Sequence, residues 1–288
     1  MNIPATAAGR DAGENLAEAS LRRLMAYAAG IGAQDECYFD DLAPGGLAAH
    51  PAFCVSLEWP VVSGPAYVAA LGRPAGAPRA AVHVMQDSRF HRPIQAGMRL
   101  LTRARIVQVR PSSAGAVVTS RIDTLEAARG ELLTTSWSSA IFLREAVDGP
   151  AASIEEPPAL RAGAGLGVAP EGRIGIDTAR GLAHRYTECA QIWNPIHTER
   201  GAARALGLPD VILHGTCTWA LAMQALIARL ADGAPGRLRR FAGRFKGMVL
   251  PGDRIEVEYG RDAGAWQFAV RTPRGELAIS HGLAEFDR

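Results

Sequence analysis

The chain has 288 residues, and its 48% hydrophobic and 21% charged residues are the composition of a globular protein with a substantial core. A formal net charge of +2 and a single lysine, Lys246, argue against a dedicated nucleic-acid-binding protein. No apolar stretch approaches the ~20 residues of a membrane span, and the polar N-terminus lacks a signal-peptide core. The four cysteines form no CxxC pair and no metal-ligand spacing. We therefore expect a cytoplasmic protein with free thiols, no nucleic-acid or membrane partner, and neither metal nor cofactor.

The first half of the chain is rich in strand-like runs. It begins with a helical pattern at 14–32, and the runs that follow alternate apolar and polar residues, as half-buried antiparallel strands do. No long apolar helix comparable to the one described below is found in this half. The predicted strands are residues 67–71, 79–90, 99–110, 115–125 and 132–143.

A segment rich in proline and glycine, residues 147–173, shows no apolar periodicity. It separates two halves of comparable size, which favours two domains. We expect an N-terminal domain at 1–146, a linker at 147–173 and a C-terminal domain at 174–288.

The second half places helices before strands. Helical patterns cover 178–193, 201–208 and 213–233, and strand patterns cover 239–250, 254–260, 265–272 and 276–286. This order indicates an α+β class rather than alternating strands and helices. The stretch 214–230 is apolar on nearly every face, which is typical of a buried helix. A long buried helix wrapped by an antiparallel sheet predicts a hot-dog fold, and the strands of the first half predict a degenerate second copy, hence a double hot-dog.

Three segments of the second half carry a family resemblance. Residues 193–197 read WNPIH, residues 212–218 read ILHGTCT, and residues 244–253 read RFKGMVLPGD. In this order they resemble the MaoC-like, R-specific enoyl-thioester hydratases. Three shorter segments resemble the N-terminal domain of the two-domain members of that family: residues 26–33, 51–53 and 91–97.

The resemblance implies a reaction and a set of residues. The reaction is reversible addition of water to a 2-enoyl thioester of coenzyme A or an acyl carrier protein, which gives an R-3-hydroxyacyl product. It needs a base for water, a proton for the α-carbon and stabilisation of the thioester oxygen. By resemblance His197 is the acid/base, Asn194 orients it, and the Gly215 N–H beside His214 is the oxyanion donor, aided by the positive end of the helix. Pro195 disfavours helix at Asn194 and would aim His197 into the site.

One expected carboxylate is missing from the sequence. The family has an aspartate two residues before the asparagine, where this chain has Ile192. Glu188 lies one helical turn before Ile192 on the same flank of the predicted helix and is a candidate replacement. Gln191 is a neutral hydrogen-bonding alternative. The remaining possibilities are that Glu188 is an ordinary exposed helix carboxylate and that the dyad is lost.

Two other functions stay open at this point. Hot-dog folds also host thioesterases, so the fold alone does not decide the chemistry. The absent aspartate is equally compatible with a non-catalytic acyl-binding or partner subunit. A double hot-dog chain can pair its two units internally, so the oligomeric state stays open between a monomer and a homodimer.

Overall fold

The computed structural model describes residues 2–76, 81–160, 165–262 and 264–287. Two compact units interleave along the chain, so neither unit is one continuous stretch. The first unit comprises Met1–Glu18, Leu57–Arg92 and Arg99–Ala159, and the second comprises Ala19–Ser56, Pro93–Met98 and Leu160–Arg288. The chain crosses from the first unit to the second for the last time after Ala159, which lies inside the segment 147–173. This segment stays a prediction as a domain boundary, and its residues 161–164 lie outside the described residues.

The first unit contains an antiparallel sheet in the order β2-β4-β5-β6-β3. Its strands are β2 (Asp11–Glu18), β3 (Ala81–Phe90), β4 (Arg99–Ser112), β5 (Gly115–Glu126) and β6 (Glu131–Leu143). The short β8 (Ala152–Ser153) pairs with β4, and β1 (Ile3–Pro4) pairs with β7 (Val147–Asp148). Four of the five strands predicted in the first half are therefore confirmed, although residues 79–80 lie outside the described part of the chain.

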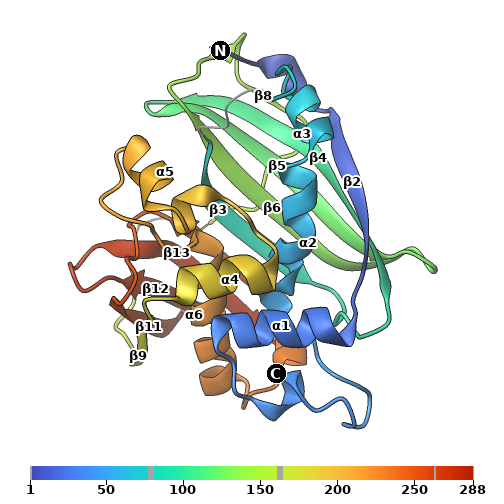
Figure 1. Ribbon diagram of the computed structural model, residues 1–288, viewed down its shortest axis with the longest axis vertical. Coiled ribbons are helices and arrows are strands. Elements are labelled where there is room, and N and C mark those ends of the chain that lie inside the picture. The colour runs from blue at the N-terminus through green and yellow to red at the C-terminus, as the bar shows by residue number, and fades with distance from the viewer. Residues whose placement is uncertain (1, 77–80, 161–164, 263, 288) are drawn as a thin grey trace. The chain divides into compact units, whose positions relative to one another are not determined.

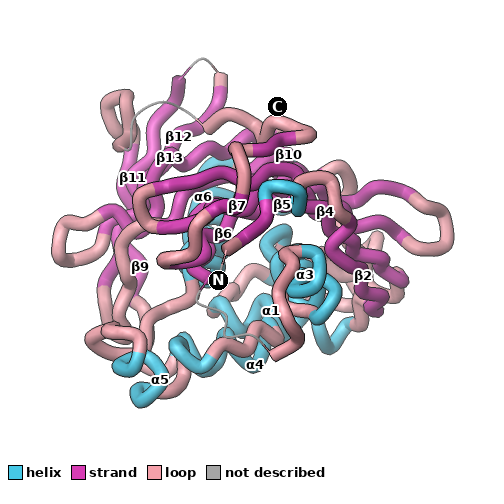
Figure 2. The backbone as a smooth tube through the Cα atoms, turned by 90° about the horizontal axis from the view of Figure 1, so that it is seen from above, coloured by secondary structure: helices cyan, strands magenta, loops and turns pink. Residues whose placement is uncertain are grey.

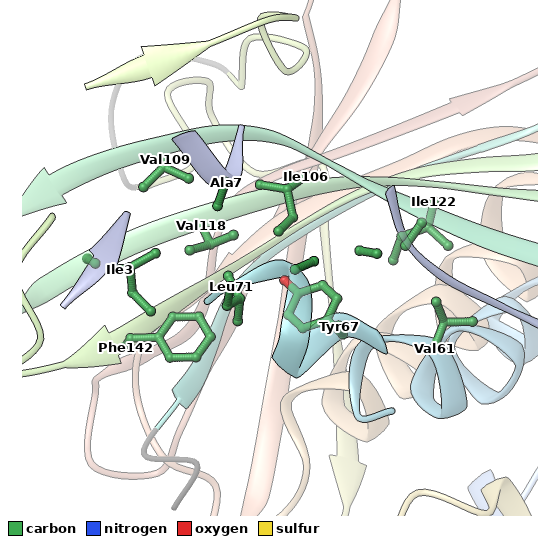
Figure 3. Packing of buried hydrophobic residues seen from close by; sticks show 14 residues of the cluster. Ile3, Ala7, Val61, Tyr67, Leu71, Ile106, Val109, Val118, Ile122 and Phe142 are labelled. Carbon is green, nitrogen blue, oxygen red and sulfur yellow. The ribbon is translucent and has the colours of Figure 1, made fainter. Parts of the chain in front are cut away.

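Helices cover one face of this sheet (Figure 1). A 3-10 turn η3 (Pro51–Phe53) leads into α2 (Cys54–Val62), which passes from the second unit into the first, and α3 (Pro65–Ala70) follows. Tyr67 and Leu71 pack with Ile106, Val118 and Phe142 in a buried cluster (Figure 3).

The prediction of a strand at 67–71 is wrong. Gly64 is the N-cap of α3 and Pro65 is its first residue, a position that suits the fixed backbone angle of proline. The run is too short for its periodicity to separate a strand from a helix. The first unit therefore does have helices against its sheet, in two short pieces rather than one long helix.

The second unit contains an antiparallel sheet in the order β10-β13-β12-β11-β9. Its strands are β9 (Gly172–Asp177), β10 (Leu238–Phe245), β11 (Arg254–Asp262), β12 (Ala265–Arg271) and β13 (Leu277–Phe286). The four predicted strands are confirmed, with the first ending at Phe245 instead of residue 250. β9 was not predicted; its first two residues, Gly172 and Arg173, were assigned to the end of the linker, and residues 174–177 were assigned to no element.

The long helix α6 (Gly215–Leu230) packs against β10 and β13 of this sheet. Its buried residues come from every side of the helix, as predicted, and exposure is confined to the last turn at Ala228 and Arg229. Each fully buried large apolar side chain contributes about 1.5–3 kcal/mol. The predicted buried central helix is confirmed.

Two helices of the second unit, α1 (Leu21–Ile31) and α4 (Leu182–Ala190), lie side by side (Figures 1 and 2). Gly30 permits their close approach, because a Cβ there would lie 2.6 Å from the Cβ of Cys189. The helix predicted at 14–32 is wrong in its first part: residues up to Glu18 belong to β2, and the side chain of Ser20 caps α1.

The remaining helical elements are short. They are η1 (Ala5–Ala7), η2 (Glu36–Tyr38), η4 (Pro195–His197), α5 (Arg200–Ala205) and η5 (Pro235–Arg237). Across the described residues, every helix is too short or too polar to cross a membrane.

Truncating a buried leucine of α6 tests this core. Leu226 is fully buried, so Leu226→Ala should lower the free energy of unfolding by about 2–5 kcal/mol. The matched control is Leu42→Ala, since Leu42 is 89% exposed and its truncation should change stability by less than about 0.5 kcal/mol. Urea denaturation followed by circular dichroism measures both. Equal effects of the two variants would contradict the assignment of α6 to the core.

Candidate active site

A capped turn positions His197 in the second unit. The side chain of Asn194 caps the 3-10 turn η4 by accepting a hydrogen bond from the Ile196 N–H at 3.3 Å. Pro195 is the first residue of the turn, where its missing N–H costs nothing. His197, the last residue of η4, is only 9% exposed. The local sequence thus turns the histidine inward immediately after α4.

The hydrogen bonds of His197 fix its tautomer. Its Nδ1 lies 2.8 Å from the carbonyl oxygen of Ile212. Because a carbonyl only accepts, the proton is on Nδ1 and Nε2 keeps its lone pair. Burial lowers the pKa of His197 to about 4, although the bond to Ile212 opposes the shift. At neutral pH the ring is uncharged, and Nε2 can accept a proton.

His214 stacks on His197, with ring centroids 3.6 Å apart and an interplanar angle of 24°. Its Nε2 donates to the carbonyl of Ile192 at 3.2 Å and lies 3.3 Å from Thr187 Oγ1. Its Nδ1 is buried and has no hydrogen-bond partner among the described residues. Burial, and then the neighbouring His197, hold the pKa of His214 well below its usual range. The two stacked rings are therefore both neutral.

The position of the expected carboxylate is occupied by an apolar, buried side chain. Ile192 is 5% exposed, and its N–H donates to the Thr187 carbonyl. Its own carbonyl accepts the bond from His214 described above. This residue therefore holds His214 in place through its backbone.

The helical argument for Glu188 is wrong in its premise. The helix α4 ends at Ala190, and Gln191 adopts a left-handed conformation with φ 57°, so Ile192 and the residues after it leave the helix direction. Glu188 and Gln191 are both exposed. Neither side chain makes a hydrogen bond or ion pair with His197 within the described part of the chain. Trp193, which follows Ile192, is 55% exposed.

The start of α6 presents uncommitted N–H groups. The N-cap residue His214 makes no side-chain cap, and the N–H groups of Gly215 and Thr216 have no acceptor among the described residues. A Cβ on Gly215 would lie 3.1–3.4 Å from three ring atoms of Phe245, so the site is too tight for a larger residue without movement of that ring. The predicted helix N-terminus and its glycine are thus next to the histidine pair.

Sequence reasoning missed a pair of buried tyrosines. Tyr186 OH donates to Thr216 Oγ1 at 3.2 Å, and the hydroxyls of Tyr186 and Tyr27 are 3.3 Å apart. The Tyr186 ring also lies 5.0 Å from the His214 ring, edge to face. Burial raises the pKa of both tyrosines, which are neutral donors. Both residues stood in segments already noted, but their contact joins positions 159 residues apart and leaves no local signal.

Titratable side chains elsewhere do not gather into a metal site. Within the described ranges, no group of three or more histidine, cysteine, aspartate or glutamate side chains could hold a metal ion. The second unit does hold a third buried histidine, His50, and burial lowers its pKa to about 3.

These buried histidines predict the pH dependence of stability. Between about pH 4 and the ordinary pKa of 6.5, the unfolded chain binds protons that folded His197 excludes. The free energy of unfolding should therefore fall as the pH is lowered through this window, by up to ~1.4 kcal/mol per pH unit for each such histidine. His197→Asn should reduce the slope, whereas the exposed His184→Asn should not. Urea midpoints across the window measure it, and a slope unchanged by His197→Asn would contradict the burial of a neutral ring.

Comparison with known proteins covers both halves of the chain. Residues 163–269 match the family described as MaoC like domain, and residues 18–145 match the MFE-2 hydratase 2 N-terminal domain. The 3-hydroxyacyl-thioester dehydratase Y of Mycobacterium tuberculosis is 28% identical over 200 residues, 68% of this chain and 67% of that protein. Fatty acid synthase subunit beta of Aspergillus oryzae is 42% identical over 78 residues, 27% of this chain. The match spans only 4% of that much longer protein.

Solved structures support the same grouping. The MaoC-like dehydratase from Phytophthora capsici aligns over 97% of this chain and 96% of its own, with a TM-score of 0.82 and 19% identity. At this identity the likeness concerns the fold, and it agrees with the antiparallel strands and the helices against them that each unit contains, as predicted for a double hot-dog. The chain therefore combines a region that matches the MFE-2 hydratase 2 N-terminal domain with a following region that matches the MaoC like domain, in the double hot-dog fold of its structural neighbours.

Proposed function

We propose that the protein reversibly adds water to a 2-enoyl thioester of coenzyme A or an acyl carrier protein, giving the R-3-hydroxyacyl thioester. One observation carries the proposal: the neutral His197, with Nε2 free to accept a proton, lies beside the uncapped N-terminus of α6. The name of the dehydratase relative, a 3-hydroxyacyl-thioester dehydratase, supports the substrate class. The cytoplasmic location and the choice between monomer and homodimer stay predictions.

In the hydration direction, His197 acts first as a base. Its Nε2 takes a proton from water while the water oxygen bonds to C3 of the enoyl group. The electron pair of the C2–C3 double bond moves toward the thioester, and negative charge develops on the carbonyl oxygen. The Gly215 N–H donates to that oxygen, and the positive end of α6 adds to the stabilisation.

The second step returns the proton. The imidazolium of His197 donates it from Nε2 to C2, the enolate collapses to the thioester, and the histidine is again neutral. One proton leaves water and reaches carbon through a single ring, so no carboxylate is required for the balance of atoms. The pKa of about 4 makes the imidazolium a strong acid for this step, at the expense of its strength as a base.

Two other residues suggested by the resemblance position His197. Asn194 keeps the turn that carries His197 rigid, and His214 packs against the face of its ring. Roles for Glu188 and Gln191 stay predictions; their exposure favours a solvent-facing carboxylate and a helix-ending residue. We therefore place the acid/base work on His197 alone.

Replacing His197 should remove the chemistry. His197→Ala should lower turnover by at least ~10²-fold, the usual contribution of one general acid/base group. Loss of enoyl absorbance with short- and long-chain 2-enoyl-CoA measures hydration, with the exposed His184→Ala as control. Release of free thiol would instead indicate a thioesterase, and binding without turnover an acyl-binding subunit. Near-full activity of His197→Ala would move the chemistry away from this turn.

Glu188→Gln should leave turnover nearly unchanged, because Glu188 is exposed and has no contact with His197 in the described part of the chain. Ile192→Asp is the informative partner, since it places a carboxylate two residues before Asn194, where the family has one. We expect this variant to raise hydration, at some loss of stability from the buried charge. A large loss of turnover in Glu188→Gln would instead establish Glu188 as the replacement carboxylate.

A further inference from the structure

We propose that the hydroxyl of Thr216 is a second donor to the thioester oxygen, acting beside the Gly215 N–H at the start of α6. This inference rests on the proposed function and adds a side chain to which the sequence assigned no role. It follows from three features of the second unit: the uncommitted proton of Thr216, the tyrosines behind it, and the absence of a cap on α6.

Among the residues that the structure describes, the hydroxyl proton of Thr216 has no acceptor. A helical threonine commonly donates to the carbonyl four residues earlier. Thr218 does so, with its hydroxyl 3.3 Å from the carbonyl of His214. For Thr216 the corresponding carbonyl is that of Ile212, which precedes the helix and accepts from His197 instead. Within the described residues, Thr216 Oγ1 accepts a hydrogen bond but donates none.

The tyrosines behind Thr216 occupy its oxygen. Because Tyr186 donates its proton to Thr216 Oγ1, the 3.3 Å contact between the tyrosine hydroxyls has Tyr27 as the donor. The three hydroxyls form a chain that runs from Tyr27 through Tyr186 to Thr216. Hydrogen bonds in such a chain polarise one another, by perhaps ~10–30% per bond. The chain therefore leaves Thr216 with one strengthened donor, directed away from the tyrosines.

His50 shows how a histidine can cap the start of a helical segment. His50 precedes η3 as His214 precedes α6, and its Nδ1 accepts from the Ala52 N–H at 3.2 Å. His214 makes no such bond, since its Nε2 is turned to the Ile192 carbonyl and its buried Nδ1 has no partner among the described residues. Donors at the start of α6 thus stay free for a ligand. Several donors that converge on one point suit a carbonyl oxygen on which negative charge develops.

Thr216→Val tests the donor, because valine keeps the branched shape and lacks the hydroxyl. With 2-enoyl-CoA we expect kcat to fall at least ~10-fold with little change in KM, since the donor acts mainly on developing charge. Thr216→Ser should recover most of the loss. Thr218→Val is the matched control on the same helix, as its hydroxyl is committed to the backbone. Thr216→Val within about twofold of wild-type kcat would overturn the proposal.

A measurement without turnover separates this proposal from the proposed function. Acetoacetyl-CoA is a 3-oxoacyl thioester whose enolate absorbs in the near ultraviolet, and oxyanion donors raise the enolate fraction of the bound ligand. Wild type and Thr218→Val should show the enolate band, and Thr216→Val should lose most of it. A wild type that shows the band without hydrating 2-enoyl-CoA would refute the proposed function and keep the Thr216 assignment. A band absent from wild type, or unchanged in Thr216→Val, would overturn the assignment.

Tyr186→Phe tests whether the tyrosine acts through Thr216. Tyr186 is a positioning residue, so Tyr186→Phe should lower the enolate band less than Thr216→Val does. In the Thr216→Val background its replacement should have almost no further effect, which a double-mutant cycle measures. Additive losses would show that Tyr186 does not act through the Thr216 hydroxyl.

Discussion

The hydrogen bond from His197 Nδ1 to the carbonyl of Ile212 ties the turn after α4 to the segment that leads into α6. It determines which nitrogen of the ring can take a proton. It also engages the carbonyl four residues before Thr216, to which a helical threonine commonly donates, so one bond bears on both the proposed base and the proposed side-chain donor. Because both ends belong to the second unit, this preparation is internal to a single compact body.

Burial gives the site its electrostatic character at a cost to stability. Burial keeps an imidazole neutral at pH values well below its ordinary pKa, so its ring nitrogen stays available to accept a proton. The three buried histidines share this neutral state. The unpartnered Nδ1 of His214 costs about 1–3 kcal/mol, the price of a buried acceptor without a donor. Unsatisfied groups of this kind are uncommon in folded proteins, and this one lies beside His197.

Much of the architecture was accessible from the sequence, because its signals are local. The all-round apolar pattern of 214–230 predicted a buried helix, and most strands followed from alternation, with β2 and β9 among the exceptions. The failures have physical causes: Pro65 starts a helix where a short apolar run read as a strand, and Gln191 ends α4 before Ile192. The histidine and glycine of the site came from the family resemblance. The Tyr27–Tyr186 contact and the His197–His214 stack depend on tertiary packing and have no sequence signature.

The packing of α1 on α4 limits how the chain can be divided into fragments that keep their structure. Tyr27 lies in the part of the sequence that matches the N-terminal family model, yet its hydroxyl is bonded to Tyr186 inside the second unit. Ser56 likewise donates to the carbonyl of Ala190 at the end of α4. A fragment that begins at residue 174 would lack both partners and expose the helix that precedes the turn of His197. The packing around this turn is therefore completed by residues that precede it by more than a hundred positions.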